Sequence, residues 1–270
     1  MKIATGNGMN RRLRVGRILG VEVFVDWSWI VTFVLAAGTL VSLNRRLLPD
    51  VSVGVAIAAA FAAAAGLFAS LGAHELVRVT AARGSGLPVH RLTLFVLGGV
   101  TDVERAPATP RTEVLGAVAA PAASLVVGLV LALGVAISSA PLPRAADDLD
   151  RMGVHGLVLA EIAAFNLAIA IVNLLPAYPL DGGRLLRALL WRVTGDVDCA
   201  TRWAAWMGQV VGWTLVVVGI AATLGVSRSP FTALGTLAAF VGWFIASAAA
   251  QGYERVIAQR SSTVASSGGG

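Results

Sequence analysis

Charged side chains are scarce in this sequence. Only 13% of its 270 residues are Asp, Glu, Lys or Arg, whereas 57% are hydrophobic. A soluble domain carries about a quarter charged residues, so this composition excludes an ordinary soluble globular protein and makes the lipid bilayer the expected solvent. The chain also has a single cysteine, Cys199, which excludes an intramolecular disulfide framework.

The sequence contains several long runs of apolar residues. A helix needs about 20 apolar residues to cross the hydrocarbon layer of a bilayer. Six runs of that kind are present, at 24–43, 52–76, 112–139, 154–175, 203–226 and 230–252. Several are rich in Ala and Gly, which allow helices to approach closely. The sequence therefore predicts an all-α polytopic membrane protein of about six transmembrane helices.

The net charge of +6 does not indicate nucleic-acid binding, because the basic residues gather at the ends of the spans. With the N-terminus in the cytoplasm, 16 of the 21 basic residues fall on the cytoplasmic side and five on the other. This distribution follows the positive-inside rule. We expect both termini in the cytoplasm, in a bacterial-type plasma membrane.

The chain divides into three parts by composition. Residues 1–23 form a basic cytoplasmic leader, 24–255 a transmembrane domain, and 256–270 a flexible Ser/Gly tail. No small-residue cleavage site closely follows the first span, so we interpret that span as a retained helix rather than a signal peptide.

One cytoplasmic segment is apolar but too short to span the membrane as a helix. It runs from Val89 to Asp102, is rich in β-branched residues and contains Gly98-Gly99. Non-helical backbone is tolerated at membrane depth only when it is buried in protein or lines a wet cavity. We therefore predict a small membrane-associated β-hairpin beside such a cavity.

Two further segments carry ionisable groups at the same cytoplasmic depth. His74-Glu75 lies about 33 Å along the second span at ~1.5 Å per residue, and Asp181 follows the fourth span after two prolines. Ionisable residues in membrane spans are costly and are candidates for function. A histidine, a glutamate and an aspartate together suggest a metal ion with a carboxylate base.

These segments resemble the site-2 protease family of intramembrane zinc metallopeptidases over roughly residues 15–255. The most specific match is the Asn-x-x-Pro-x-x-Pro-Leu-Asp-Gly-Gly-Arg segment at 173–184, and the others lie at 16–29, 73–76 and 94–100. The resemblance implies a site-2 protease-like fold. It also implies Zn²⁺ as cofactor and membrane-anchored proteins, such as anti-sigma factors, as clients.

The same resemblance implies roles for individual residues. His74 and Asp181 match zinc ligands, Glu75 matches the catalytic base, and Asn173 matches an asparagine associated with substrate binding. The family's second ligand histidine, however, is replaced by Arg78, in a Val-Arg pair where the family has Gly-His. Ala120-Pro121 likewise stands where Gly-Pro is common.

Arg78 determines how activity is interpreted. A guanidinium has no lone pair for zinc and places a positive charge where the metal would sit. Arg78 is therefore a candidate replacement for the metal, paired with Glu75 at i,i+3 or with Asp181. We predict a site-2 protease homologue acting on membrane-helix clients with impaired or lost zinc catalysis, which leaves open whether it is an enzyme.

Three alternatives remain at this point. The first is a pseudoprotease that binds membrane proteins without cleaving them. The second is a working metal site in which His90 of the hairpin replaces the missing ligand, although an interfacial histidine on a turn is the simpler interpretation. The third is a transporter, which the absence of an internal repeat disfavours. The oligomeric state and the client are not determined by the sequence.

Overall fold

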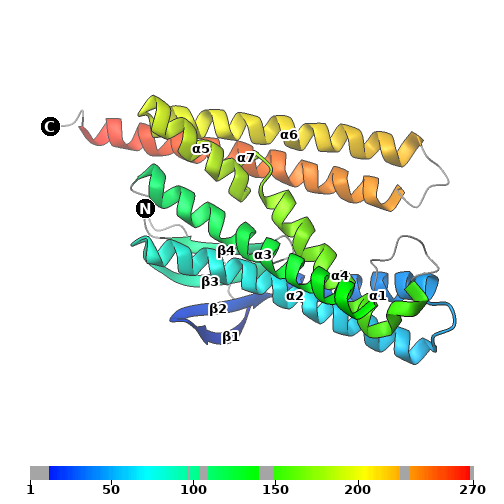
Figure 1. Cartoon of the computed structure of the whole chain (residues 1–270). Helices are drawn as coiled ribbons and strands as arrows, with labels where there is room; N and C mark the ends of the chain where they lie inside the picture. Colours follow the sequence, from blue (N-terminus) through cyan, green and yellow to red (C-terminus); the bar gives the residue numbers. More distant parts are fainter. Residues whose placement is uncertain (1–11, 96–97, 104–108, 140–148, 226–231, 268–270) are drawn as a thin grey trace. The chain divides into compact units, whose positions relative to one another are not determined.

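The computed structural model describes residues 12–95, 98–103, 109–139, 149–225 and 232–267 (Figure 1). The chain divides into two compact units. Unit 1 comprises Met1–Ala106 and Ala119–Ala170, and unit 2 comprises Pro107–Val118 and Ile171–Gly270. The division falls within the helices at 110–139 and 149–173, so each of these two helices contributes residues to both units.

Seven helices lie in the part of the chain that the structure describes. They are α1 (Trp27–Leu47), α2 (Val53–Gly84), α3 (Pro110–Ser139), α4 (Leu149–Asn173), α5 (Asp181–Thr194), α6 (Val197–Gly225) and α7 (Thr232–Ser267). All except α5 are long and apolar enough to cross a membrane, which confirms the six predicted spans. The chain is an integral membrane protein, and α5 is the amphipathic helix between two of its spans.

Four strands form one sheet in unit 1, in the order β1 (Arg12–Ile18), β2 (Val21–Asp26), β3 (Val89–Phe95) and β4 (Gly98–Val103). The predicted hairpin is confirmed as the antiparallel pair β3 and β4. Strand β2 pairs in parallel with β3, and α1 and α2 supply the crossover that a parallel pair needs.

Strands β1 and β2 were not predicted, since their residues lie mostly within the segment interpreted as a basic leader. They form an antiparallel hairpin joined by Leu19 and Gly20, both with positive φ (49° and 79°). Two residues of that conformation match the twist of a hairpin turn. The prediction was wrong because a segment in which arginines alternate with other residues can be an exposed strand as well as a disordered leader. Strand β1 is almost entirely exposed, and only alternate residues of β2 are buried.

Alternate residues of the sheet form the core of unit 1. Val21, Val23 and Val25 of β2 pack with Leu92 and Leu94 of β3, together with Val79 of α2 and Val89. Helix α2 packs against β3 and β4, and α1 against β2 and β3. The hairpin is therefore held firmly against the helix that carries His74 and Glu75.

Small residues bring α6 and α7 together in unit 2, as the composition predicted. A Cβ atom on Gly212 would lie 2.6 Å from the Gly242 carbonyl oxygen, and one on Gly219 would lie 2.5 Å from that of Gly235. Only glycine fits at such backbone approaches.

Helix α7 is longer than the sequence analysis predicted. It continues to Ser267, through most of the segment interpreted as a flexible Ser/Gly tail. Ser and Thr are poor helix formers, but extending an existing helix avoids the cost of nucleating a new one.

Candidate functional site

His74 and Glu75 lie on α2 and are both buried, with 3% and 7% of their surfaces exposed. Adjacent positions on a helix point in different directions, and the two side chains have different neighbours. The Nδ1 atom of His74 lies 2.9 Å from the Ser124 hydroxyl of α3. Glu75 faces the hairpin, where a Cβ atom on Gly99 would lie 2.6 Å from its Oε2 atom. Glycine at 99 therefore makes room for the carboxylate.

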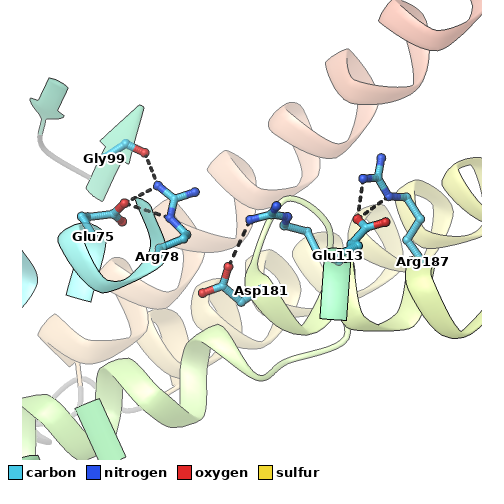
Figure 2. Close-up of polar contacts among 7 residues, drawn as sticks. Glu75, Arg78, Gly99, Glu113, Asp181 and Arg187 are labelled. Atoms are coloured by element: carbon cyan, nitrogen blue, oxygen red, sulfur yellow. Dashed lines mark hydrogen bonds and ion pairs between the residues drawn. The ribbon is translucent and has the colours of Figure 1, made fainter. Parts of the chain in front are cut away.

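Arg78 follows Glu75 by one helical turn and pairs with it (Figure 2). Its Nε donates to Glu75 Oε2 at 3.0 Å, and its Nη2 donates to the same oxygen. The Nη2 atom also donates to the Gly99 carbonyl oxygen at 2.9 Å. Of the two partners that the sequence left open for Arg78, the structure shows the i,i+3 partner Glu75, and the hairpin backbone adds an acceptor that the sequence did not suggest.

A cavity of about 320 Å³ opens beside His74 within unit 1. Its walls are mostly apolar, but Ser70, Ser124 and Asn166 contribute polar groups. The Asn166 amide donates to the Ser70 hydroxyl and to the Ile162 carbonyl oxygen, both at 2.9 Å. Asn166 is 1% exposed, so a polar network lies inside the membrane domain next to the motif.

The second motif, residues 173–184, joins α4 to α5 in unit 2. Asp181 is 4% exposed and is the first residue of α5, rather than part of a turn before it. Its Oδ1 atom lies 3.7 Å from Nη1 of Arg184. Asn173 is the last residue of α4 and is half-buried.

The two glycines of this motif have a packing role. A Cβ atom on Gly182 would collide with the carbonyl oxygens of Leu174 and Leu175, and one on Gly183 would collide with the backbone of Tyr178. The first turn of α5 therefore lies directly against the proline-containing segment before it. This close approach fixes where Asp181 begins the helix.

A second buried ion pair joins α3 to α5 in unit 2 (Figure 2). The Nε atom of Arg187 donates to Glu113 Oε1 at 2.7 Å, and its Nη2 pairs with the same oxygen. The Glu113 side chain is 0% exposed. Arg187 also lies over the Tyr178 ring, with its guanidinium carbon 5.8 Å from the ring centre.

Comparison with known proteins finds similarity to one family of peptidases. The model of peptidase family M50 matches residues 139–218. Two proteins that carry the name "Putative zinc metalloprotease" are similar over most of the chain: one from Synechocystis sp., 32% identical over 89% of the chain, and Rip3 of Mycobacterium tuberculosis, 34% identical over 93%. The chain is thus similar, over most of its length, to zinc metalloproteases of the site-2 protease (M50) type.

A solved structure supports the same fold. The site-2 protease from Methanocaldococcus jannaschii superposes with a TM-score of 0.57, at 22% identity, over 90% of this chain and 95% of that one. The chain spans 59% of the length of the Synechocystis relative and 61% of Rip3.

Arg78, at the position of the family's second ligand histidine, does not fit a zinc site, because a guanidinium has no lone pair for a metal ion. Within the described residues, no group of three or more His, Cys, Asp or Glu side chains is arranged to hold a metal ion. The guanidinium of Arg78 is bonded to Glu75, the residue that matches the family's base. The guanidinium of Arg78 therefore binds the Glu75 carboxylate, which matches the family's catalytic base beside zinc.

His90 is poorly placed to replace the missing ligand. It is exposed and lies near the start of β3, whereas Glu75 contacts Gly99, which pairs with Leu94. Leu94 lies four positions along the strand from His90, about 13 Å at ~3.3 Å per residue. The structure does not bring His90 to the Glu75 end of the hairpin.

Four residues of the site were not identified from the sequence. Ser124, Asn166 and Glu113 are buried polar or charged residues of apolar helices, and Arg187 was assigned only to the cytoplasmic charge. The available signal was that a polar residue inside an apolar span is costly and is usually paired. Their side-chain partners lie 50 or more residues away in the chain, so no local pattern indicated the pairs.

Proposed function

We propose that this site-2 protease homologue binds membrane-anchored proteins without hydrolysing them, because Arg78 has replaced the zinc ion as the positive charge beside Glu75. The observation that carries the proposal is the set of contacts made by the Arg78 guanidinium. It donates twice to Glu75 Oε2 and once to the Gly99 carbonyl oxygen. A residue with three such contacts is a fixed part of the site.

Charge and geometry both oppose zinc at this position. The guanidinium stays protonated at any accessible pH, and it repels a dication at short range in a medium of low dielectric constant. Glu75 Oε2 already accepts two charge-assisted hydrogen bonds from Arg78, so it is not available to activate water. Loss of one ligand from a three-residue zinc site also lowers its affinity for zinc.

Client binding does not require the metal. In the described part of the sheet, β4 is an edge strand, next to the Glu75–Arg78 pair. An edge strand recognises an extended peptide through backbone hydrogen bonds, whatever the peptide's sequence. A membrane helix that unwinds beside β4 is the client that this arrangement suits. The fold can thus keep recognition while the chemistry is lost.

Zinc-dependent proteolysis is the competing function, and the similarity to zinc metalloproteases favours it. His74, Glu75 and Asp181 are present, and the relatives are named as zinc metalloproteases. The metal content of the purified chain separates the two functions. We expect far less than one zinc per chain, whereas the Val77→Gly/Arg78→His variant, which restores the family's residues, is expected to bind roughly one.

Activity provides the second arm of that experiment. A membrane-anchored test substrate is incubated in proteoliposomes with the wild-type chain, and with a control in which Glu75→Gln removes the base. We expect no cleavage by either, but co-purification of the substrate with both. One zinc per wild-type chain, together with cleavage that the Glu75→Gln control abolishes, would refute the proposal.

We also propose that both termini lie in the cytoplasm, on the basis of the basic residues at the span ends. Cys199 offers a direct test because it is the only cysteine and lies near the start of α6, on the expected cytoplasmic side. In intact cells a membrane-impermeant maleimide is expected to leave Cys199 unlabelled, and it is expected to label Cys199 in inverted vesicles. Labelling in intact cells alone would reverse the topology.

A further inference from the structure

A groove in unit 2 lies between the start of α3 and the second half of α5. Its volume is about 400 Å³, and it is lined by Pro110, Arg111, Val114 and Leu115 of α3 and by Ala188, Leu189 and Arg192 of α5. The α3 residues are spaced i, i+1, i+4 and i+5, and the α5 residues i, i+1 and i+4. Each set therefore forms one face of its helix.

The Glu113–Arg187 pair holds these two helices together. Glu113 and Arg187 belong to the same turns as the lining residues but do not line the groove themselves. Both partners are largely buried, with side-chain exposures of 0% and 15%. The groove is consequently a built feature of unit 2, fixed by a buried ion pair between its two walls.

The lining of the groove is apolar except for two arginines, Arg111 and Arg192. Leu115 is 62% exposed and Leu189 is 59% exposed, although both are large hydrophobic residues. Arg111 and Arg192 are also exposed, and no acidic residue lines the groove. Neither guanidinium has a hydrogen bond or ion pair with any residue that the structure describes.

The location of the groove identifies its environment. The apolar span of α3 begins at Pro110, and the spans of α4 and α6 end and begin on either side of α5. The start of α3 and the end of α4 lie on the same membrane side, because the two helices cross in succession. The groove therefore lies at the boundary between headgroups and acyl chains, where basic residues between helices hold lipid phosphates.

We propose that this groove binds one anionic phospholipid. Arg111 and Arg192 hold the headgroup phosphate, for which a guanidinium provides paired donors. The first part of an acyl chain covers Val114, Leu115 and Leu189. The site is separate from the Glu75–Arg78 pair, and it stands whether or not the chain hydrolyses peptides.

Native mass spectrometry of the full chain in detergent tests the proposal, with phosphatidylglycerol and phosphatidylcholine added separately. We expect one tightly bound phosphatidylglycerol per chain. Its affinity in the Arg111→Gln/Arg192→Gln variant is expected to be about thirtyfold lower, from the loss of two basic residues at a lipid headgroup. The matched control is Arg45→Gln/Arg46→Gln, which removes the same charge at the end of α1 and is expected to bind as the wild type does.

Two further arms identify the part of the lipid that is recognised. Leu189→Asn is expected to weaken phosphatidylglycerol binding without a change in charge, and inorganic phosphate or glycerol phosphate is expected not to displace the lipid. Equal binding of the two lipids by the wild-type chain overturns the proposal without any variant. Displacement by inorganic phosphate, with Leu189→Asn unchanged, overturns it in favour of a simple anion site.

Discussion

Each unit of this protein contains a buried glutamate held by an arginine, but the two pairs have different consequences. In unit 1, Glu75 and Arg78 lie on one helix, three residues apart. In unit 2, Glu113 and Arg187 lie 74 residues apart and join α3 to α5. The first pair lies within one motif, and the second fixes a tertiary contact. An ion pair is therefore a poor guide to function until its position in the fold is known.

Exposure also distinguishes the pairs. The Glu113 side chain is 0% exposed, whereas that of Glu75 is 9% exposed. The arginines are 15% and 20% exposed respectively. A buried charge that loses its partner is costly in proportion to its burial. We therefore expect disruption of the unit 2 pair to destabilise the protein more.

The largest expected effect is that of Arg187→Met. The substitution leaves Glu113 buried without its cation and is expected to lower the free energy of unfolding by about 3–5 kcal/mol. Unfolding of the purified protein in mixed micelles measures the loss. The matched control is Arg192→Met on the same helix, whose exposed side chain predicts a change within about 0.5 kcal/mol. Equal losses in the two variants would contradict the assigned role of the Glu113–Arg187 pair.

Arg78→Met is expected to lower the free energy of unfolding by a smaller amount, about 2–3 kcal/mol. The reason is that the Glu75–Arg78 pair lies within one helix and is less completely buried. A double-mutant cycle with Glu75→Gln isolates the interaction, and we expect a coupling energy of about 1–3 kcal/mol. Arg192→Met provides the surface control, with an expected change within about 0.5 kcal/mol. A coupling energy near zero would show that Arg78 does not replace the metal as a structural charge.

The smallest of the three effects is that of Gly99→Ala, which tests whether the hairpin takes part in the unit 1 pair. The new Cβ atom would lie 2.6 Å from Glu75 Oε2, so the carboxylate must move. We expect a loss of about 1–3 kcal/mol from overpacking. At Gly72 of α2 the nearest atom to an added Cβ is 3.8 Å away, so Gly72→Ala is the control and is expected to be neutral or slightly stabilising. If the two variants were equally stable, the hairpin would not constrain Glu75.

Much of the fold followed from local patterns. The six spans depend on length and hydropathy alone, and the bounds predicted from the sequence agree with the helices to within several residues at most ends. The β3–β4 hairpin followed from Gly98-Gly99 in an apolar stretch too short to span. Strands β1 and β2 did not follow, because their Arg-rich segment was interpreted as a leader and because the pairing of β2 with β3 depends on a crossover through two helices.

The sequence by itself determined the membrane class and the family motifs, because these depend on composition and on short local patterns, and it left two possible partners for Arg78, namely Glu75 and Asp181. Tertiary structure alone decided the rest. It added the Gly99 carbonyl as a third contact of Arg78, placed Ser124 on His74, and joined Glu113 to Arg187 beside the Arg111–Arg192 groove. These contacts depend on how distant segments pack, which no spacing along the chain encodes.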